Sequence, residues 1–429
     1  MTLQLHPLEI LPIVLYLGFL LFLGLRSKSH KNLDDFVLGS RLLTLPAFVA
    51  TLVTTWYGGI LGIGEFTYLY GLSNWLVFGV PYYIFAILFA FFLAPKIRSS
   101  GMLSIPDQFF KNYGRSSGFL GTVFTFFMTL PAAYVLMLGL LIQIFSGWPL
   151  WVCVILGALF SMVYVLTGGF RAVVRTDKFQ FILMFGGFLI LFFILFSRYG
   201  GLDFLQENLP AFHLSPLGGH SWQYILVWFF IASWTFIDPG FYQRCYAAKS
   251  PATAKTGILW SVFFWFVFDF LTTSTGLYAR ALFTDLNNPA LSFPVLSHTI
   301  LPPLLSGLFL TGLLATIMST VDSLSLLSAI TIGYDFLGKF RSGQRSPIDA
   351  VRTGLVITAI ISILVAVLIP SVVQIWYVLG TLFIPPMLLP LIACYFPRIR
   401  PAPPWTLLNL YLSFFASFFF LLFSILKSP

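Results

Sequence analysis

Five hydroxyl-bearing side chains share one face of a long apolar segment, and together they have the chemistry to hold a small cation. The segment reads LLATIMSTVDSLSLLSAITIGYD, residues 313–335. Helical spacing of about 100° per residue places all five within roughly 60° of one direction: Thr316, Ser319, Thr320, Ser323 and Thr331. Sodium is a hard cation that prefers oxygen ligands, and neutral hydroxyls suit a monovalent ion that must be released in each cycle. The pattern favours a sodium site, while helix–helix packing through Ser and Thr remains the alternative.

Three carboxylates also lie inside apolar segments. Asp322 lies about 120° from the centre of the hydroxyl face, Asp269 lies within FWFVFDFLTTSTG, and Glu65 follows a glycine-rich stretch. A carboxylate inside a bilayer is costly and is a functional candidate by default. Two interpretations stay open for each: a hydrogen-bonded packing residue, or a contact to substrate or coupling ion, including a proton on Asp322 or Asp269.

The segments that must position these groups are predicted to be membrane-spanning helices. Of the 429 residues, 59% are hydrophobic and only 9% are charged, against roughly 25% charged in soluble domains. The apolar runs are long and continuous, which favours helices over a β-barrel. The sequence predicts an all-α polytopic membrane protein with about twelve spans, at residues 10–26, 43–70, 74–94, 117–146, 148–167, 177–198, 222–247, 254–280, 299–336, 353–370, 372–396 and 405–426.

Positive charge is distributed unevenly between the loops that join these spans. All but three of the 23 Lys and Arg residues fall on one side, the exceptions being Arg198, Arg280 and Lys427. This count assigns Arg244 to a loop on the rich side. The positive-inside rule makes that side cytoplasmic and places both termini outside. The net charge of +9 is therefore explained by topology, and no nucleic-acid partner is predicted.

Two of the predicted spans are interrupted near their middles. One contains TTWYGGILGIGE, residues 54–65, and the other contains SWTFIDPGFYQR, residues 233–244. Gly and Pro weaken a helix and free backbone groups, which survive at membrane depth only where protein or a water-filled cavity satisfies them. Interrupted segments at matching positions in two halves of a chain indicate an inverted-repeat transporter with its site at the midplane.

Four stretches resemble the sodium:solute symporter family. They are DDFVLGSRLLTLPAFVATLVTTWYGG from residue 34, GGFRAVVRTDKFQ from 168, YQRCYAAKS from 242 and MSTVDSLSLLSA from 318. The resemblance implies the leucine-transporter fold, with two inverted five-helix repeats and one extra helix before and after them. It divides the chain into an N-terminal helix and cytoplasmic loop (1–42), a first repeat (43–198), an extracellular loop (199–221), a second repeat (222–396) and a C-terminal helix (397–429).

The same resemblance implies a set of sodium ligands. The hydroxyls of Ser319 and Thr320 and the carbonyl of Thr316 come from one helix. Two carbonyls come from the first broken span, either those of Thr54 and Tyr57 or, with the motif aligned two residues earlier, those of Leu52 and Thr55. Asp177 matches a family aspartate near the cytoplasmic entrance and is expected either on the ion's exit path or in an ion pair with Arg175 or Lys178.

A substrate pocket is expected between the broken spans. Its candidate residues are mostly aromatic or small and polar: Trp56, Glu65, Ser233, Trp234, Thr235, Trp376 and Tyr377. Trp234 falls where sugar-carrying members of the family place an aromatic inner gate, but the polar contacts that those members make to sugar hydroxyls are not apparent. An apolar, aromatic-lined pocket is ordinary for small ligands and does not name the solute.

The predicted function is sodium-driven symport of a small organic solute across the plasma membrane, in bacteria the inner membrane. The expected partners are sodium, the solute and membrane lipid, with no obligatory protein partner. Proton coupling on the same fold and a transporter-like sensor are the alternatives. An enzyme is not expected, because no HExxH or GxSxG motif is present and the five His residues lie near span ends or in loops.

Overall fold

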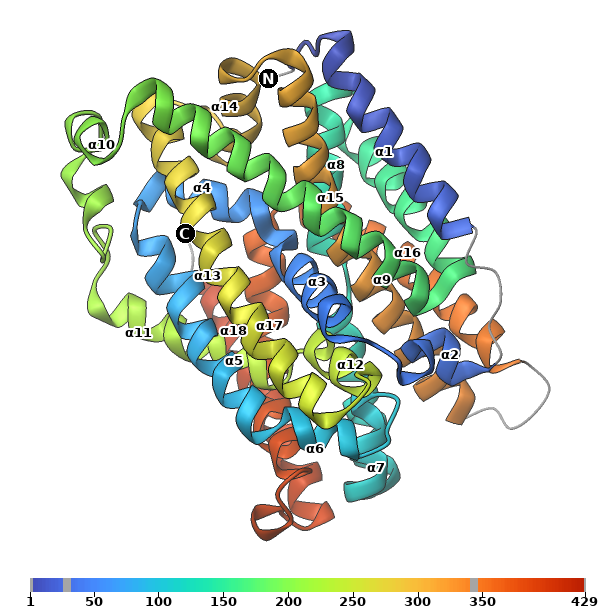
Figure 1. The fold of residues 1–429 in the computed structure, drawn as a ribbon. Helices are drawn as coiled ribbons and strands as arrows, with labels where there is room; N and C mark the ends of the chain where they lie inside the picture. The colour runs from blue at the N-terminus through green and yellow to red at the C-terminus, as the bar shows by residue number, and fades with distance from the viewer. Residues whose placement is uncertain (1–2, 26–31, 340–345, 428–429) are drawn as a thin grey trace.

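The computed structural model describes residues 3–25, 32–339 and 346–427, which form a bundle of helices (Figure 1). Five of the charges used to orient the chain lie outside these residues: Arg26, Lys28, Lys31, Arg341 and Arg345. The α-helices of the first half are α1 (Pro7–Leu25), α2 (Leu33–Leu38), α3 (Leu45–Trp56), α4 (Ile60–Tyr70), α5 (Val80–Phe92), α6 (Ala94–Ser99), α7 (Ile105–Thr129), α8 (Ala132–Ser146) and α9 (Leu150–Tyr199).

The second half of the chain continues the bundle. Its α-helices are α10 (Leu202–Asn208), α11 (Trp222–Ile231), α12 (Pro239–Ala247), α13 (Pro251–Leu282), α14 (Ser292–Ile300), α15 (Pro303–Ile330), α16 (Pro347–Leu368), α17 (Val372–Ala393) and α18 (Pro403–Lys427). Short 3-10 or π segments join or extend them: η1 (Gly39–Arg41), η2 (Tyr57–Gly59), η3 (Trp75–Gly79), η4 (Ala211–Leu214), η5 (Ala232–Phe236), η6 (Pro289–Leu291), η7 (Thr331–Gly338) and η8 (Pro397–Ile399).

Ten helical runs in the described residues are long and apolar enough to cross a membrane, and α1 is a shorter apolar helix. The prediction of an all-α polytopic protein is therefore confirmed. One boundary differs from the prediction: the expected spans 148–167 and 177–198 are not separated by a loop, since α9 is continuous except at Gly169. This glycine has φ 53° and ψ −152°, a conformation that redirects the helix and that side-chain-bearing residues avoid.

Two further segments predicted as loops are helical. The run that contains the expected span 117–146 starts at Ile105, because the Ser104 side chain caps the first turn by accepting a hydrogen bond from the Asp107 amide, and Pro106 follows in that turn. The expected extracellular loop 199–221 contains α10 and η4. Short polar helices of this kind carry too little periodicity to be separated from loops by sequence alone.

Both predicted interruptions are present. The first broken span consists of α3, the 3-10 segment η2 and α4. The second consists of α11, η5, a non-helical step at residues 237–238, and α12. At the ends of these spans the chain pairs through an isolated parallel bridge, in which the Leu43 amide donates to Ala247 O and the Lys249 amide donates to Leu43 O, both at 3.0 Å. The start of the first broken span is thus joined to the end of the second.

Helix α15 forms the centre of the bundle, and its most apolar window is 83% buried. It packs against α1, α3, α7, α8, α9 and α16. In Figure 1, α10 and α14 lie at one end of the bundle, while α2, α6 and the start of α7 lie at the other. This arrangement places the hydroxyl face of α15 against the first broken span, where the site is assembled.

Candidate functional site

The hydroxyls of Ser319 and Thr320 meet the first broken span inside the bundle. Thr320 Oγ1 donates to the carbonyl oxygen of Thr55 at 2.6 Å. Ser319 Oγ lies 3.5 Å from Thr55 Oγ1 and donates to Asp177 Oδ1 at 2.6 Å. The Ser319 and Thr320 side chains are buried. The helix break and the hydroxyl face therefore supply oxygen atoms to one small, dry region.

Gly58 makes this close approach possible. A Cβ atom at position 58 would lie 2.1 Å from Thr320 Oγ1 and 2.4 Å from Thr320 Cβ. Any side chain there would push η2 away from α15. The glycine in the WYGG motif is thus required by the packing of the broken span on the hydroxyl face as well as by the break itself.

The five predicted sodium ligands are only partly brought together. Thr316 Oγ1 and Thr54 Oγ1 bond back to carbonyls of their own helices, Gly312 O at 2.7 Å and Ala50 O at 2.8 Å. The Thr54 carbonyl accepts the Tyr57 amide. The Tyr57 hydroxyl reaches α13, where it donates to Asp269 Oδ1 at 2.5 Å. The carbonyl that faces Thr320 belongs to Thr55, as in the alternative alignment of the motif.

The hydroxyl face of α15 divides into two groups. Thr316 and Thr331 bond back along the helix, whereas Ser319, Thr320 and Ser323 reach neighbouring helices. Ser323 Oγ lies 3.0 Å from Thr55 Oγ1. Helical spacing alone could not separate the hydroxyls that pack locally from those that meet another helix.

Arg244 is the main residue of the site that the sequence missed. The positive-inside count assigned it to a cytoplasmic loop, which is wrong: the residue lies in α12 and its side chain is 0% exposed. Its Nη2 atom donates to three hydroxyls, Thr51 Oγ1 at 2.9 Å, Thr55 Oγ1 at 2.8 Å and Ser323 Oγ at 2.7 Å. A single arginine therefore joins α12 to α3 and α15. A signal was present, because Arg244 lies within the expected span 222–247, and an arginine inside a membrane span is a functional candidate.

Asp177 faces Arg244. Their closest atoms, Arg244 Nη2 and Asp177 Oδ2, are 3.8 Å apart, and both side chains are 0% exposed. The carboxylate also accepts hydrogen bonds from Thr51 and Ser319. The expected ion pair with Arg175 or Lys178 is replaced by a pair across helices, which sequence neighbours could not reveal.

The carboxylates of Asp322 and Asp269 are each enclosed by hydroxyl donors. Asp322 accepts from Ser161 and Tyr164 of α9, and Asp269 accepts from Tyr57 and Tyr83. Both aspartates are buried. Buried charge is retained where hydrogen bonds satisfy it, so these contacts fit the packing interpretation.

We expect Asp322→Ala to lower the free energy of unfolding by about 1–3 kcal/mol, because two buried hydroxyls lose their acceptor. The half-saturating sodium concentration of the variant should stay within twofold of the value for the unmodified protein. Thermal unfolding in detergent, measured over a sodium titration, checks both. Ser325→Ala is the matched control, since its buried hydroxyl has no hydrogen-bond partner in the described residues. A sodium response that vanishes in Asp322→Ala would instead make Asp322 part of the coupling machinery.

Aromatic side chains surround the break in the first span. The Trp56 ring lies 5.1 Å from Tyr82, 5.6 Å from Phe241 and 5.3 Å from Trp265. On the other side of the break, the Trp376 ring packs so closely on Gly59 that a Cβ there would lie 2.8 Å from it. Two of the predicted pocket residues thus flank η2.

The other predicted pocket residues are more dispersed. Trp234 is partly buried, and its Nε1 donates to Asp238 Oδ2 at 3.0 Å. Thr235 is buried and bonds back to Ala232 O. Ser233 and Glu65 are partly buried in η5 and α4. Tyr377 is 49% exposed, so nothing in the structure brings it to the pocket.

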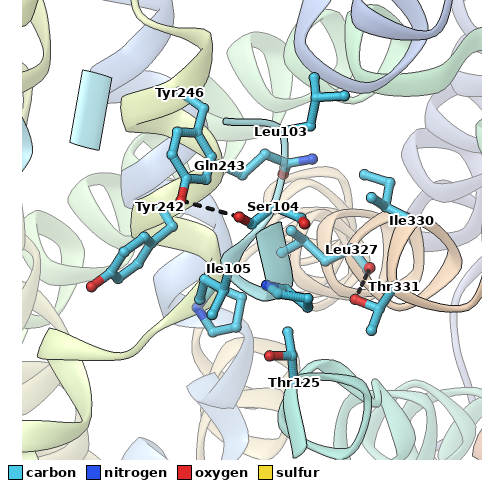
Figure 2. A pocket seen from close by; sticks show the side chains of 12 residues that line it. Leu103, Ser104, Ile105, Thr125, Tyr242, Gln243, Tyr246, Leu327, Ile330 and Thr331 are labelled. Carbon is cyan, nitrogen blue, oxygen red and sulfur yellow. Dashed lines mark hydrogen bonds between the residues drawn. The ribbon is translucent and has the colours of Figure 1, made fainter. Parts of the chain in front are cut away.

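A small cavity lies beside α12. It is lined by Leu103, Ser104, Ile105, Pro106, Thr125, Pro239, Tyr242, Gln243, Tyr246, Leu327, Ile330 and Thr331. Figure 2 shows Tyr246 and Gln243 facing Ser104 across it, with the Tyr246 hydroxyl bonded to Ser104 O at 3.3 Å. The Ser104 hydroxyl donates in turn to Asp335 Oδ1 at 2.7 Å. The start of α7 therefore closes this cavity against α12 and η7.

Two interrupted helices around a buried cluster of oxygen atoms are the features of a secondary transporter. Residues 36–399 match the model of the sodium:solute symporter family. Because that match covers most of the chain, the protein belongs to the sodium:solute symporter family, as its motifs predicted.

Individual relatives agree with this assignment. The chain is 24% identical over 418 residues to sodium/glucose cotransporter 4 of Mus musculus, covering 85% of this chain and 60% of the relative. It is 25% identical over 411 residues to the osmoregulated proline transporter OpuE of Bacillus subtilis (strain 168), covering 88% of this chain and 82% of the relative. The chain thus spans 60% of the length of the first relative.

A solved structure shows the same fold. The substrate-bound outward-open state of a Na+-coupled sialic acid symporter superposes with a TM-score of 0.77, covering 91% of this chain and 86% of that one. The sequences are 18% identical. The shared arrangement of helices is therefore much better preserved than the side chains, and the solute does not follow from it.

Proposed function

We propose that this chain is a sodium-driven symporter that moves a small organic solute across a bacterial inner membrane by alternating access. The observation that carries the proposal is the contact between the α15 hydroxyls and the broken first span, with Thr320 Oγ1 2.6 Å from the Thr55 carbonyl. This contact favours a sodium site formed by the hydroxyls of Ser319 and Thr320 and the carbonyls of Thr316, Leu52 and Thr55. Family membership supports sodium as the ion.

Twelve spans in two inverted five-helix repeats are part of the proposal. Ten apolar runs span a membrane by length. Counting α9 as two spans that meet at Gly169 and adding α1 gives twelve. The breaks in α3–α4 and α11–α12 then occupy the first helix of each repeat, and both termini lie outside. This arrangement would place the aromatic groups near the bilayer midplane.

Sodium would act by bridging the two sides of the transporter. The ion binds more tightly when the broken first span and α15 are held together, and only such a difference in affinity can shift the conformational equilibrium. The solute binds beside Trp56 and Trp376, between the broken spans. One charge moving inward through a potential of 100 mV is worth about 2.3 kcal/mol, which supports roughly a fifty-fold gradient of a neutral solute.

Sodium-specific thermal stabilisation tests the proposal without knowledge of the solute. We expect the unfolding midpoint of the purified protein to rise in sodium chloride relative to potassium or choline chloride at equal ionic strength. The Ser319→Ala, Thr320→Ala variant should lose at least about 90% of its sodium affinity, since two of the oxygen ligands are gone. The Ser325→Ala variant should retain the full response.

Two results would reject this site. Equal sodium stabilisation of the double variant and the unmodified protein would show that the ion binds elsewhere. The absence of any sodium effect, together with stabilisation on lowering the pH, would assign the coupling to protons.

A further inference from the structure

We propose that the Arg244 guanidinium is a tethered cation that competes with sodium for the hydroxyl cluster and is displaced from it when sodium binds. This inference rests on the sodium site proposed above. Because Arg244 belongs to α12, the final helix of the second broken span, sodium binding would act directly on that helix. Three features of the site carry it.

The first feature is a shared set of ligands. Arg244 Nη2 binds the hydroxyl of Thr55, whose carbonyl oxygen is a proposed sodium ligand and accepts from Thr320. It also lies 3.8 Å from Asp177, which accepts from the proposed ligand Ser319. Of the oxygen atoms around the guanidinium, the Thr55 hydroxyl belongs to a proposed sodium ligand, and Ser323 and Asp177 are hydrogen-bonded to proposed ligands.

The second feature is the balance of charge. In the described residues, Asp177 is the only carboxylate in an ion pair with Arg244, and Asp238 interacts with it electrostatically from the start of α12. One directly contacting carboxylate cannot fully compensate two adjacent cations where water is excluded. Sodium and the guanidinium therefore disfavour each other's presence in the cluster.

The third feature is that the arginine is incompletely held. All three hydroxyl bonds go to one nitrogen, Nη2. The buried Nε has no hydrogen-bond partner among the described residues. An arginine with a fixed structural role commonly donates two parallel N–H···O hydrogen bonds from its planar guanidinium to one carboxylate. Arg244 makes no such parallel pair to a carboxylate: among the described residues its one further hydrogen bond runs from Nη1 to Gln243 Oε1.

The displaced guanidinium would move toward Gln243, its neighbour in α12. Arg244 Nη1 donates to Gln243 Oε1 at 3.1 Å, and Gln243 lines the small cavity between α12 and the start of α7 (Figure 2). Ser104 and Thr125 supply polar atoms to the same cavity. Movement of Arg244 toward Gln243 would disturb the contact that closes α12 against α7. Sodium binding would in this way reach the cytoplasmic end of the second broken span.

Sodium titrations of arginine variants test this competition. We expect Arg244→Gln to lower the half-saturating sodium concentration for thermal stabilisation by about tenfold, because a competing charge is removed. Ser323→Ala removes one acceptor of the guanidinium without removing a proposed sodium ligand and should lower it by about threefold. Arg171→Gln, which breaks a different ion pair with Asp35, is the control and should leave it unchanged.

A second readout follows α12 itself. In a background with Cys153 and Cys394 replaced by serine, the buried thiol of Cys245 next to Arg244 reports opening of α12 through its rate of maleimide labelling. Sodium should change this rate several-fold in the parent protein. In Arg244→Gln the rate should no longer depend on sodium, although sodium still stabilises the protein.

The outcomes separate the two proposals. No sodium-specific stabilisation of the unmodified protein would reject the sodium site. Sodium stabilisation with an unchanged or raised half-saturating concentration in Arg244→Gln, or in Ser323→Ala if the former does not fold, would leave the site intact and overturn the competition. Retention of the sodium-dependent labelling change in Arg244→Gln would also overturn it.

Discussion

Replacing Asp177 with alanine is expected to lower the free energy of unfolding by about 3–5 kcal/mol. The reason is that the variant leaves the positive charge of Arg244 buried without its paired carboxylate. Arg244 and Asp177 are both 0% exposed and 3.8 Å apart. Without the carboxylate, the guanidinium stays buried, and its direct hydrogen-bond partners are the neutral hydroxyls and the Gln243 amide.

The effect is measured as a fall of several degrees in the thermal unfolding midpoint in detergent. A variant that also carries Arg244→Met should recover most of the loss, because replacing a whole buried ion pair with apolar groups is often nearly neutral. Asp349→Ala breaks the exposed pair between Arg352 and Asp349, whose side chains are 45% and 58% exposed, and should cost less than about 1 kcal/mol. An Asp177→Ala variant as stable as this control would mean that the buried pair does not carry opposite charges.

Replacing Gly58 with alanine is expected to abolish the sodium response and to destabilise the fold by about 1–3 kcal/mol. The new Cβ would lie 2.4 Å from Thr320 Cβ, an atom fixed close to the backbone of α15. Relief therefore requires that η2 and α15 separate. Separation would pull the Thr55 carbonyl away from the Thr320 hydroxyl and open the proposed sodium site.

Sodium titrations of thermal stability in Gly58→Ala and Gly186→Ala check this prediction. Gly186 lies in α9, and a Cβ atom there would have no described atom of another residue within 4 Å beyond its own turn of helix. Alanine at this position should therefore be neutral or raise stability by about 0.5–1 kcal/mol. A full sodium response in Gly58→Ala would show that the ion does not need the close approach of the broken span to α15.

The features that depend on one helix at a time could be predicted from the sequence. The glycines and proline that interrupt two spans and the apolar length of the spans act locally, and both features are present in the structure. The four motif stretches correctly identified the family.

The features that depend on contacts between helices could not be predicted. The charge count predicts a loop position for Arg244, whereas the residue belongs to α12, which follows the break at residues 237–238 and is buried in the bundle. The partners of Asp177 come from α3, α12 and α15 rather than from neighbours in sequence. The rotation of a helix after a break is set by packing, so single-helix periodicity does not contain it.

The backbone bridge between Leu43 and Ala248 has a consequence for how tightly ion movement is coupled to solute movement. It joins the beginning of one interrupted span to the end of the other through two backbone hydrogen bonds of 3.0 Å. Movement of either interrupted span alone would break these hydrogen bonds. In the proposed alternating-access cycle the two interrupted helices would therefore move together, which would limit the passage of an ion without its solute.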